Sequence, residues 1–520
     1  MSLTQILGHN RLRELIETMG DSIHRRAFDV GIKFTMPDSP IQTGPDDAAR
    51  YIATYFRKLH PLSPFLDRQS FEEMALGPGI SELLAKSAAF NALYHTVLAL
   101  GCQYIDGGSF DPGEGKAWKY FQIALGLFPK LLVPIDGLVH VQALTAMAIF
   151  AMNFSCIQIS DTLISEAARL VQVLGYNAAY VPGNDEKACH RVFWVIYWQE
   201  RVFCFFRGRA SMIPEYDIGC PVPDITETPT DGLDWLLVTA RLGRLMSRMY
   251  ECLFSVSAVQ MPKETRLAAI ESMFYELEVW RGSVPEELRP NTSSFSSNAD
   301  KAYGSAHEMR TQLQFLYYAL IVSLCRLRIH LSADQHNPSD QEIKLRLMEA
   351  ARSIIYLSRH IEHEPHVPVW EIGMVPISAL FVIFDFVVHN PLHQETNINL
   401  AFLDIASGYF SRWEVSHKGS FPEFSISEFS HIAREFVRDS HIRSQQEVPV
   451  TEGISDQRSQ NNGDEPLDPS AATGSFAALS GYLFYPEDPL QPVLGNSMLA
   501  ATDLSSIFNA PYWPPYTAGF

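Results

Sequence analysis

The stretch RVFWVIYWQERVFCFFRGRASMIPEYDIGCPVP, residues 191–223, decides the fold predicted for this chain. From Arg191 to Phe206, apolar residues fall on nearly every side of a helix, which predicts a central helix covered all round. A charge buried in such a helix is destabilising unless it finds an opposite charge and hydrogen bonds. We therefore expect Glu200 and Arg201 to belong to a buried ion-pair network that fixes how neighbouring helices meet.

Two arginines mark the end of this helix. Glycine adopts positive φ at little cost, so Gly208 is predicted to turn the chain out of the helix between Arg207 and Arg209. Two further roles of these arginines stay open. Contact with DNA is disfavoured because no other basic residues gather beside them, whereas contact with a small ligand is compatible with the sequence.

The composition bounds the class of protein. The chain has 520 residues, of which 47% are hydrophobic, and a formal net charge of −19. Free nucleic acid repels so acidic a chain unless basic residues are concentrated in a patch, and the lysines and arginines are scattered. Two nearly uncharged stretches, LVHVQALTAMAIFAMNFSCIQIS and IGMVPISALFVIFDFVV, contain polar residues and lack basic flanks. They are predicted to be buried core helices rather than membrane spans.

The seven cysteines are widely spaced and never form a C-x-x-C pair. With no signal peptide at the N-terminus, this pattern favours reduced, intracellular thiols that mostly lie in the core. The first twenty residues, MSLTQILGHNRLRELIETMG, are typical of a short amphipathic helix.

Helical patterns dominate the sequence up to about residue 440. DDAARYIATYFRKL (46–59) has acids in its first turn and bases in its last, as the helix dipole prefers. SELLAKSAAFNALYHTVLALG (81–101) has apolar residues at helical spacing, and SDTLISEAARLVQVLG (160–175) begins with a Ser-Asp cap and closes on glycine. Strand patterns are scarce. The prediction is an all-α protein of 15 or more helices with a disordered acidic C-terminal tail.

The chain divides into three parts: an N-terminal helix and linker (1–44), a helical regulatory domain (45–440), and a disordered linker with a tail (441–520). The linker is polar and rich in Pro, Gly and Ser. The tail interleaves acids with aromatic and aliphatic residues, which is typical of an activation segment. The residues expected to act in it are Phe484, Tyr485, Leu504, Ile507, Phe508, Tyr512 and Trp513.

No catalytic constellation is present, so we expect neither an enzyme nor a cofactor. GGSFDPGEGKAW (107–118) resembles a phosphate loop but lacks its required glycine and Ser/Thr, which favours a surface turn. HIEHEPH (360–366) lacks the spacing of a zinc site, and Pro365 would interrupt the helical turn, so a solvated helix end is expected. Asp46 and Asp47 lack the further acids of a terpene cyclase magnesium site. No G-x-S-x-G elbow of a serine hydrolase is present.

Three blocks of sequence carry a family resemblance. They are YIATYFRKLHPLSPFLDRQSF (51–71), VQALTAMAIFAMNF followed by EAARLVQVLGY (141–176), and the opening stretch. Together they resemble the fungal-specific transcription factor domain, the helical middle homology region of fungal zinc-cluster regulators. The positions that match its signature are Arg191, Phe193, Trp194, Tyr197, Glu200, Arg201, Gly208, Arg209 and Pro223, most of them expected to be structural. Glu200 replaces the usual Asp and Ala210 replaces the usual Pro.

The resemblance implies a nuclear regulator of transcription, often of a secondary-metabolite gene cluster, which can form homo- or heterodimers and respond to a small-molecule effector. The six-cysteine zinc cluster that normally precedes this domain is missing, since no cysteine lies before residue 45. We therefore expect the chain to act through a DNA-bound partner rather than to bind DNA directly. The alternatives are an upstream exon that encodes the cluster, or a helical sensor module that binds a small molecule.

Overall fold

A computed structural model of the chain describes residues 31–105, 108–133, 137–153, 157–181, 185–223, 234–286, 288–290, 305–332, 338–368, 370–416 and 426–446. These ranges contain 16 α-helices and no strand, which confirms the all-α prediction. The expected N-terminal helix falls before residue 31 and the activation segment falls after residue 446, so both lie outside the described residues.

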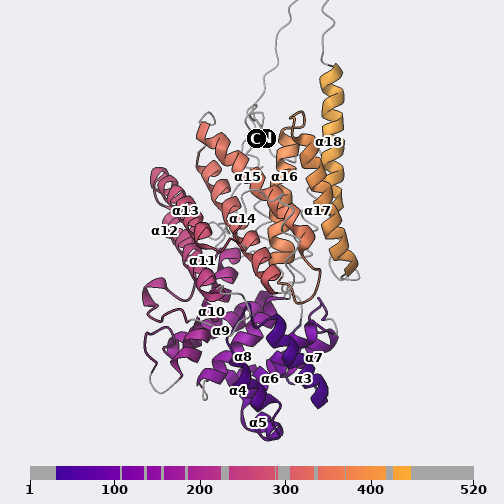
Figure 1. The fold of residues 1–520 in the computed structure, drawn as a ribbon. Helices are drawn as coiled ribbons and strands as arrows, with labels where there is room; N and C mark the ends of the chain where they lie inside the picture. The colour runs from indigo at the N-terminus through magenta and orange to yellow at the C-terminus, as the bar shows by residue number, and fades with distance from the viewer. Residues whose placement is uncertain are drawn as a thin grey trace, which may run out of the picture.

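The N-terminal half of the molecule consists of eight helices, which fill the lower part of Figure 1. Their bounds are α3 Pro45–Lys58, α4 Arg68–Ala75, α5 Ile80–Lys86, α6 Ala88–Gln103, α7 Gly115–Leu131, α8 Gly137–Met152, α9 Ile157–Val173 and α10 Glu186–Arg207. Helix α6 packs against α3, α7 and α8, and α9 packs against α8 and α10.

The C-terminal half continues upward from α10 in the same view. Its helices are α11 Trp235–Met249, α12 Val256–Val259, α13 Lys263–Ser283, α14 Ser305–Leu331, α15 Pro338–Leu357, α16 Val375–His389, α17 Thr396–Ser416 and α18 Ile426–Gln446. Two π-helical turns, at Tyr250–Phe254 and Trp370–Met374, interrupt this series. Helices α14 to α18 pack each against the next along the chain.

Helix α10 connects the two hydrophobic cores. Its residues up to Tyr197 pack in the N-terminal core, and its residues from Trp198 onward pack in the C-terminal core. Phe193, Trp194 and Tyr197 are fully buried. This arrangement confirms the prediction of a central helix covered all round, and the apolar residues on every side of α10 are its physical cause.

Two helix boundaries differ from the sequence-based expectation. The segment 81–101 is two helices, because Ser87 leaves the helical conformation and its hydroxyl accepts a hydrogen bond from Phe90 N, which starts α6 anew. Helix α9 begins at Ile157, so Ser160 does not cap it; the Ser160 hydroxyl instead donates to the Ala151 carbonyl of α8. In both cases a side chain competes for the backbone in a way that periodicity does not reveal.

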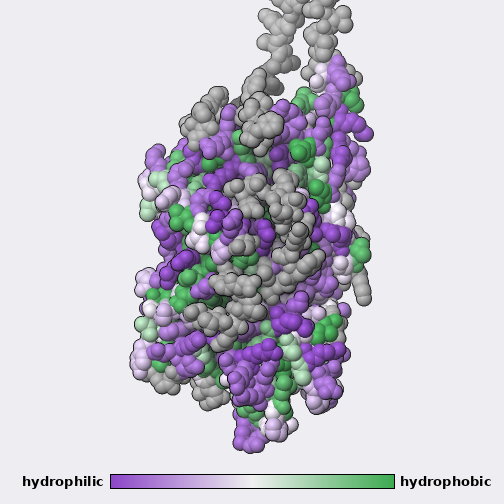
Figure 2. Space-filling view, viewed as in Figure 1, coloured by the Kyte–Doolittle hydropathy of each residue, from purple (hydrophilic) through white to green (hydrophobic). Residues whose placement is uncertain are grey.

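The two nearly uncharged stretches form α8 and α16, whose residues are almost all buried within the protein. Across the described helices, none is both long and apolar enough to cross a bilayer. Cys102, Cys189, Cys220 and Cys325 are buried as free thiols, while Cys252 is exposed. On the face shown in Figure 2, hydrophilic and hydrophobic residues are interspersed over the described surface.

Candidate functional site

Helix α10 holds the residues of the signature in place. The Asp185 carboxylate caps its start by accepting from Ala188 N, and the helix then runs without a break to Arg207. The Arg191 guanidinium is buried and donates to the Leu66 carbonyl (3.3 Å), while the Trp194 indole donates to the Pro221 carbonyl (2.9 Å). Arg191 therefore anchors a segment before α10, and Trp194 anchors one after it.

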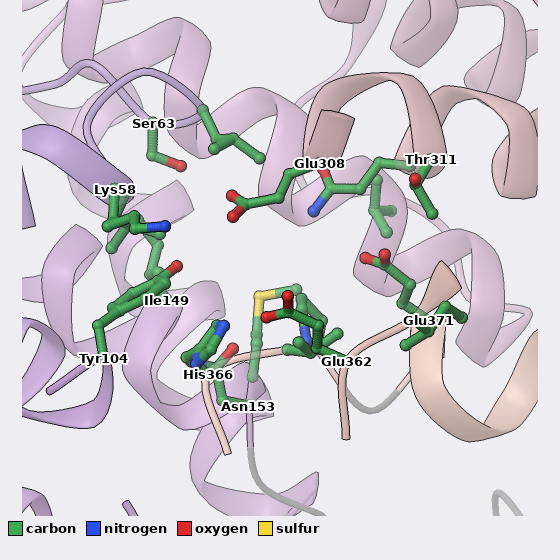
Figure 3. A pocket seen from close by; sticks show the side chains of 18 of the residues that line it. Lys58, Ser63, Tyr104, Ile149, Asn153, Glu308, Thr311, Glu362, His366 and Glu371 are labelled. Atoms are coloured by element: carbon green, nitrogen blue, oxygen red, sulfur yellow. The ribbon is translucent and has the colours of Figure 1, made fainter. Parts of the chain in front are cut away.

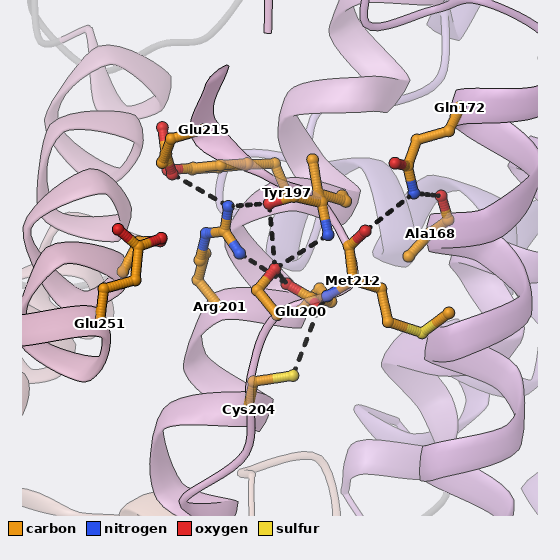
Figure 4. A network of polar contacts seen from close by, with 12 residues as sticks. Ala168, Gln172, Tyr197, Glu200, Arg201, Cys204, Met212, Glu215 and Glu251 are labelled. Carbon is orange, nitrogen blue, oxygen red and sulfur yellow. Dashed lines mark hydrogen bonds and ion pairs between the residues drawn. The ribbon is translucent and has the colours of Figure 1, made fainter. Parts of the chain in front are cut away.

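The carboxylate of Glu200 is 1% exposed and makes contacts with both oxygens. Its Oε1 accepts from Met212 N (2.7 Å) and from the Cys204 thiol (3.3 Å). Its Oε2 accepts from the Ser211 hydroxyl (2.7 Å) and from Arg201 (3.3 Å). These hydrogen bonds offset the hydration that the carboxylate loses on burial (Figure 4).

Arg201 extends the network toward Glu215. Its guanidinium donates to the Ile213 carbonyl and to Glu215 Oε1 (2.9 Å), and it lies over the ring of Tyr197. The Tyr197 hydroxyl donates to the same Glu215 oxygen (2.5 Å). Burial raises the pKa of the Tyr197 hydroxyl far above its usual range, so the phenol remains a donor at any physiological pH.

The network joins different parts of the chain from those expected. The partners of Glu200 come from α10 itself and from the loop after it, not from a neighbouring helix. That loop then contacts its neighbours: Gln172 of α9 donates to the Met212 carbonyl (3.2 Å), and Arg244 of α11 lies 3.7 Å from Glu215. The adjacent helices are thus fixed through the loop, because short loop donors reach the carboxylate more easily than side chains across a helix interface.

The end of α10 has the geometry that the sequence predicts. Gly208 has φ 61° and ψ 33°, in the left-handed region, and Arg209 N donates back to the Cys204 carbonyl (3.0 Å). Arg209 pairs with Asp161 of α9 (2.6 Å), so this arginine serves an intramolecular ion pair. Pro223, the last residue of the signature, is buried.

A cavity lies between the two halves of the molecule. Its volume is about 460 Å³. Residues at or just after the ends of α3, α6 and α8 line it, together with residues of α10, the start of α14 and the segment from His360 to Glu371. Its charged lining residues are Lys58, Glu308, Glu362 and Glu371, and Figure 3 shows all four pointing into the same space.

Two carboxyl groups in this cavity have strongly shifted pKa values. Burial raises the pKa of Glu371 to about 8, and the neighbouring charge of Glu308 adds to the shift. Burial likewise raises the pKa of Glu308 to about 7, against the opposing effect of Lys58. At neutral pH this site therefore holds carboxyl groups that retain protons much of the time.

The histidines of HIEHEPH follow the end of a helix, as predicted, but they are half-buried rather than solvated. Helix α15 ends at Leu357, and the chain then crosses the cavity wall. His366 stacks on Tyr104 with ring centroids 4.0 Å apart, and burial lowers its pKa to about 4. His363 packs against Tyr409, and burial lowers its pKa to about 4 as well. Both imidazoles are half-buried and neutral at physiological pH.

The residues considered for catalysis have other contacts. Lys116, in the segment that resembles a phosphate loop, donates to the Tyr51 hydroxyl (2.6 Å) and lies 3.6 Å from Asp47. Asp47, considered for magnesium binding, also pairs with Arg50. In the part of the chain that the structure describes, no group of three His, Cys, Asp or Glu side chains is placed to hold a metal.

Sequence patterns did not identify Glu215 of the α10 network, nor Glu371 and Glu308 of the cavity. Glu215 lies in a loop and gains its role only when Arg201, Tyr197 and Arg244 converge on it. Glu371 stands just before a long apolar run, and a lone acid in that position is the one signal that could have drawn attention to it. The position of Glu308 beside it depends on tertiary packing alone.

Comparison with known proteins matches one continuous segment of the chain to a known family of domains. Residues 52–282 match the fungal specific transcription factor domain. The chain carries this domain. It extends from within α3 to the end of α13 and includes the whole α10 network, so the family resemblance carried by the opening stretch is confirmed.

Curated relatives of this domain are fungal transcription factors. An ABC-transporter-regulating transcription factor of Aspergillus oryzae is 25% identical over 330 residues, which is 57% of this chain and 36% of that protein. The fusaridione A cluster transcription factor of Fusarium heterosporum is 22% identical over 384 residues, 70% of this chain and 71% of that protein. The fumonisin cluster-specific transcription factor of Gibberella moniliformis is 22% identical, over 54% of this chain and 44% of that protein. The chain thus spans little more than a third of the Aspergillus relative.

Proposed function

We propose that this protein is a fungal nuclear regulator of transcription, and that its helical body is the regulatory and interaction part. The match of residues 52–282 to the fungal specific transcription factor domain carries this proposal. The relatives that regulate transporter genes or secondary-metabolite clusters support control of a metabolic gene set. We expect no enzymatic turnover, because the motifs considered for catalysis serve structural contacts.

Contact with promoters is proposed to occur through a DNA-bound partner, such as a zinc-cluster protein. The formal net charge of −19 supports this, since an acidic body gains nothing from counterion release on DNA. Arg209, the most exposed arginine of the signature turn, is engaged with Asp161. The purified chain should therefore fail to shift promoter DNA by itself and should shift it when the partner is added.

The experiment that tests the proposal is chromatin occupancy of the epitope-tagged protein in its native cells. We expect peaks at the promoters of a coherent gene set, and the DNA motif beneath them would identify the partner. A cytosolic protein without peaks, under conditions in which the candidate genes are expressed, would refute the regulatory role.

The C-terminal tail is proposed to recruit the transcription machinery. Its aromatic and aliphatic residues alternate with Glu487, Asp488 and Asp503, which keeps apolar side chains solvated yet available. Deletion of residues 481–520 should weaken a reporter at least several-fold, while the melting temperature of the helical body stays the same. A matched control replaces only Phe508 and Trp513 by alanine and should reproduce most of the loss. Full activation without the tail would remove this assignment.

A further inference from the structure

The cavity between the two halves is built from parts far apart in the sequence. Leu59 and Leu62 follow α3, Ile149 and Met152 end α8, and Glu308 begins α14. A volume of about 460 Å³ falls within the range of small-molecule sites, which commonly lie at interfaces between structural units. A ligand in this position would contact both cores at once.

In the cavity lining that the structure describes, carboxyl groups outnumber lysine and arginine side chains. Three carboxyl groups, from Glu308, Glu362 and Glu371, point into it against the single ammonium group of Lys58 (Figure 3). The imidazole of His366 is neutral and supplies no compensating charge. An ammonium group that enters the cavity can take the place of the protons that Glu308 and Glu371 retain, whereas an added anion would find only one lysine.

Glu371 shows that the site is incomplete as it stands. The residue is 6% exposed, and its Oε2 has no hydrogen-bond partner among the described residues, although Gln312 donates a hydrogen bond to the carboxylate. A buried polar atom without a partner is destabilising and calls for a functional explanation. Glu371 lies in the π-helical turn Trp370–Met374, a local distortion often found at functional sites.

The remaining walls are apolar and aromatic. Trp198 and Val202 of α10 face the cavity on one side, and Ile149, Met152 and Tyr104 lie on others. Such walls favour a ligand with a hydrophobic or aromatic body and disfavour a bare metal ion, which requires a complete shell of oxygen ligands. The ring faces of Trp198 and Tyr104 also attract organic cations.

We propose that this cavity binds a small organic amine, whose protonated ammonium group donates hydrogen bonds to Glu371 Oε2 and to Glu308. Its apolar body lies against Trp198 and the end of α8. The ammonium supplies the donor that Glu371 lacks, and the body displaces water from the apolar walls. A ligand of this class bridges the two cores, so its binding stabilises the way they pack.

The test is calorimetric titration of the full-length purified protein with matched probes. Each set consists of an amine, an alcohol and an acid on one scaffold: phenylpropyl, indolylethyl and octyl. We expect at least one amine to bind at least tenfold more tightly than its alcohol, with no detectable binding of the corresponding acid. Equal affinity for amine and alcohol in every set, or preference for an acid, would overturn the proposal.

Variants assign the binding to this cavity. Glu371→Gln keeps the shape and removes the charge, so the preference for the amine should fall to less than twofold while binding of the alcohol is unchanged. Glu349→Gln, on the exposed side of α15 and outside the cavity, should bind like the wild type. An unchanged amine preference in Glu371→Gln would refute the assignment, and circular dichroism of each variant verifies that it is folded.

Proton release gives a second readout. Since Glu308 and Glu371 retain protons near neutral pH, amine binding should release protons, and affinity should rise from pH 6 to pH 8. The other titratable groups that face these two are Lys58, Tyr104, His307, His360, Glu362, His366 and Tyr409. Proton uptake on binding would contradict the proposal. These measurements use purified protein, so their outcome does not depend on the proposed role in transcription.

Discussion

Two buried glutamates in this protein have opposite surroundings. Glu200 is 1% exposed and receives hydrogen bonds on both oxygens from Ser211, Met212, Cys204 and Arg201. Glu371 is 6% exposed and has one oxygen with no partner. Two glutamates of nearly equal burial thus differ in their hydrogen bonds: both oxygens of Glu200 accept them, whereas Oε2 of Glu371 has no partner among the described residues.

The difference separates a structural role from a ligand-binding role. Around Glu200 the chain supplies every contact from a regular helix and the loop that returns over it, so both carboxylate oxygens are satisfied. Around Glu371 the chain supplies a π-helical turn, a second carboxyl group and an open volume. Buried polar groups are normally satisfied, and the exception is where a function is to be sought.

The largest expected effect is that of Glu200→Ala, which tests the structural side of the comparison. The substitution removes one acceptor of Arg201, which keeps Glu215 and the Ile213 carbonyl. It also removes the 2.7 Å acceptors of Met212 N and of the Ser211 hydroxyl. We expect the free energy of unfolding to fall by about 3–5 kcal/mol. Thermal and urea unfolding of the purified protein would measure it. A melting temperature equal to that of the wild type would show that the network does not stabilise the fold.

Asp404→Ala provides the matched control for an exposed carboxylate. Asp404 pairs with Arg434, and both side chains are about half exposed. The expected loss is about 0.2–1 kcal/mol, because solvent screens the pair. A cost equal to that of Glu200→Ala would mean that burial is not what makes the α10 network important.

Glu371→Gln tests the glutamate that lacks a partner. This substitution should raise the free energy of unfolding, whereas Glu200→Ala should lower it. The pKa of Glu371 is raised to about 8 by burial, whereas in the unfolded chain it is that of an ordinary glutamate. Folding thus favours the protonated form, and its contribution is present below about pH 4 and is lost as the pH rises toward 8. The unfolding free energy of the variant should exceed that of the wild type by no more than about 1 kcal/mol at pH 5 and by about 2–4 kcal/mol at pH 8.

Urea unfolding at several pH values between 5 and 8.5 would measure this difference. Glu342→Gln, at an exposed position of α15 outside the cavity, should leave the pH profile of the wild type nearly unchanged. If Glu371→Gln lowered the unfolding free energy at pH 8, the carboxylate would have a stabilising partner and the comparison with Glu200 would fail.

Periodicity predicted most of the fold. The apolar residues on every side of α10 indicated a central helix, and the low charge of α8 and α16 indicated burial; both expectations are met. Where prediction failed, a local side-chain contact decided. Ser87 starts a new helix with its hydroxyl, and the histidines after Leu357 are half-buried because Tyr104 and Tyr409 offer ring contacts.

The candidate site could be predicted only in part. The signature around Arg201 is contiguous in sequence, so the chain order itself places Glu200 near the loop that binds it. The cavity around Glu371 joins α3, α8, α10 and α14, and no pattern within one segment reports such a meeting. A site that depends on long-range packing becomes visible only in three dimensions.

The smallest expected effect tests the turn that closes the α10 network. Gly208 has φ 61°, a conformation that costs a residue with a Cβ about 1–2 kcal/mol, so Gly208→Ala should lower the unfolding free energy by that amount. Gly408→Ala is the matched control, because Gly408 lies in the middle of α17 with no atom close to its would-be Cβ, so this substitution should stabilise the protein by about 0.5–1 kcal/mol. If Gly208→Ala lowered the free energy of unfolding and the control substitution raised it, the left-handed turn, and not glycine content, would hold Arg209 and the loop over Glu200. If both substitutions changed the free energy of unfolding in the same direction, the loop would adopt its position without the left-handed turn.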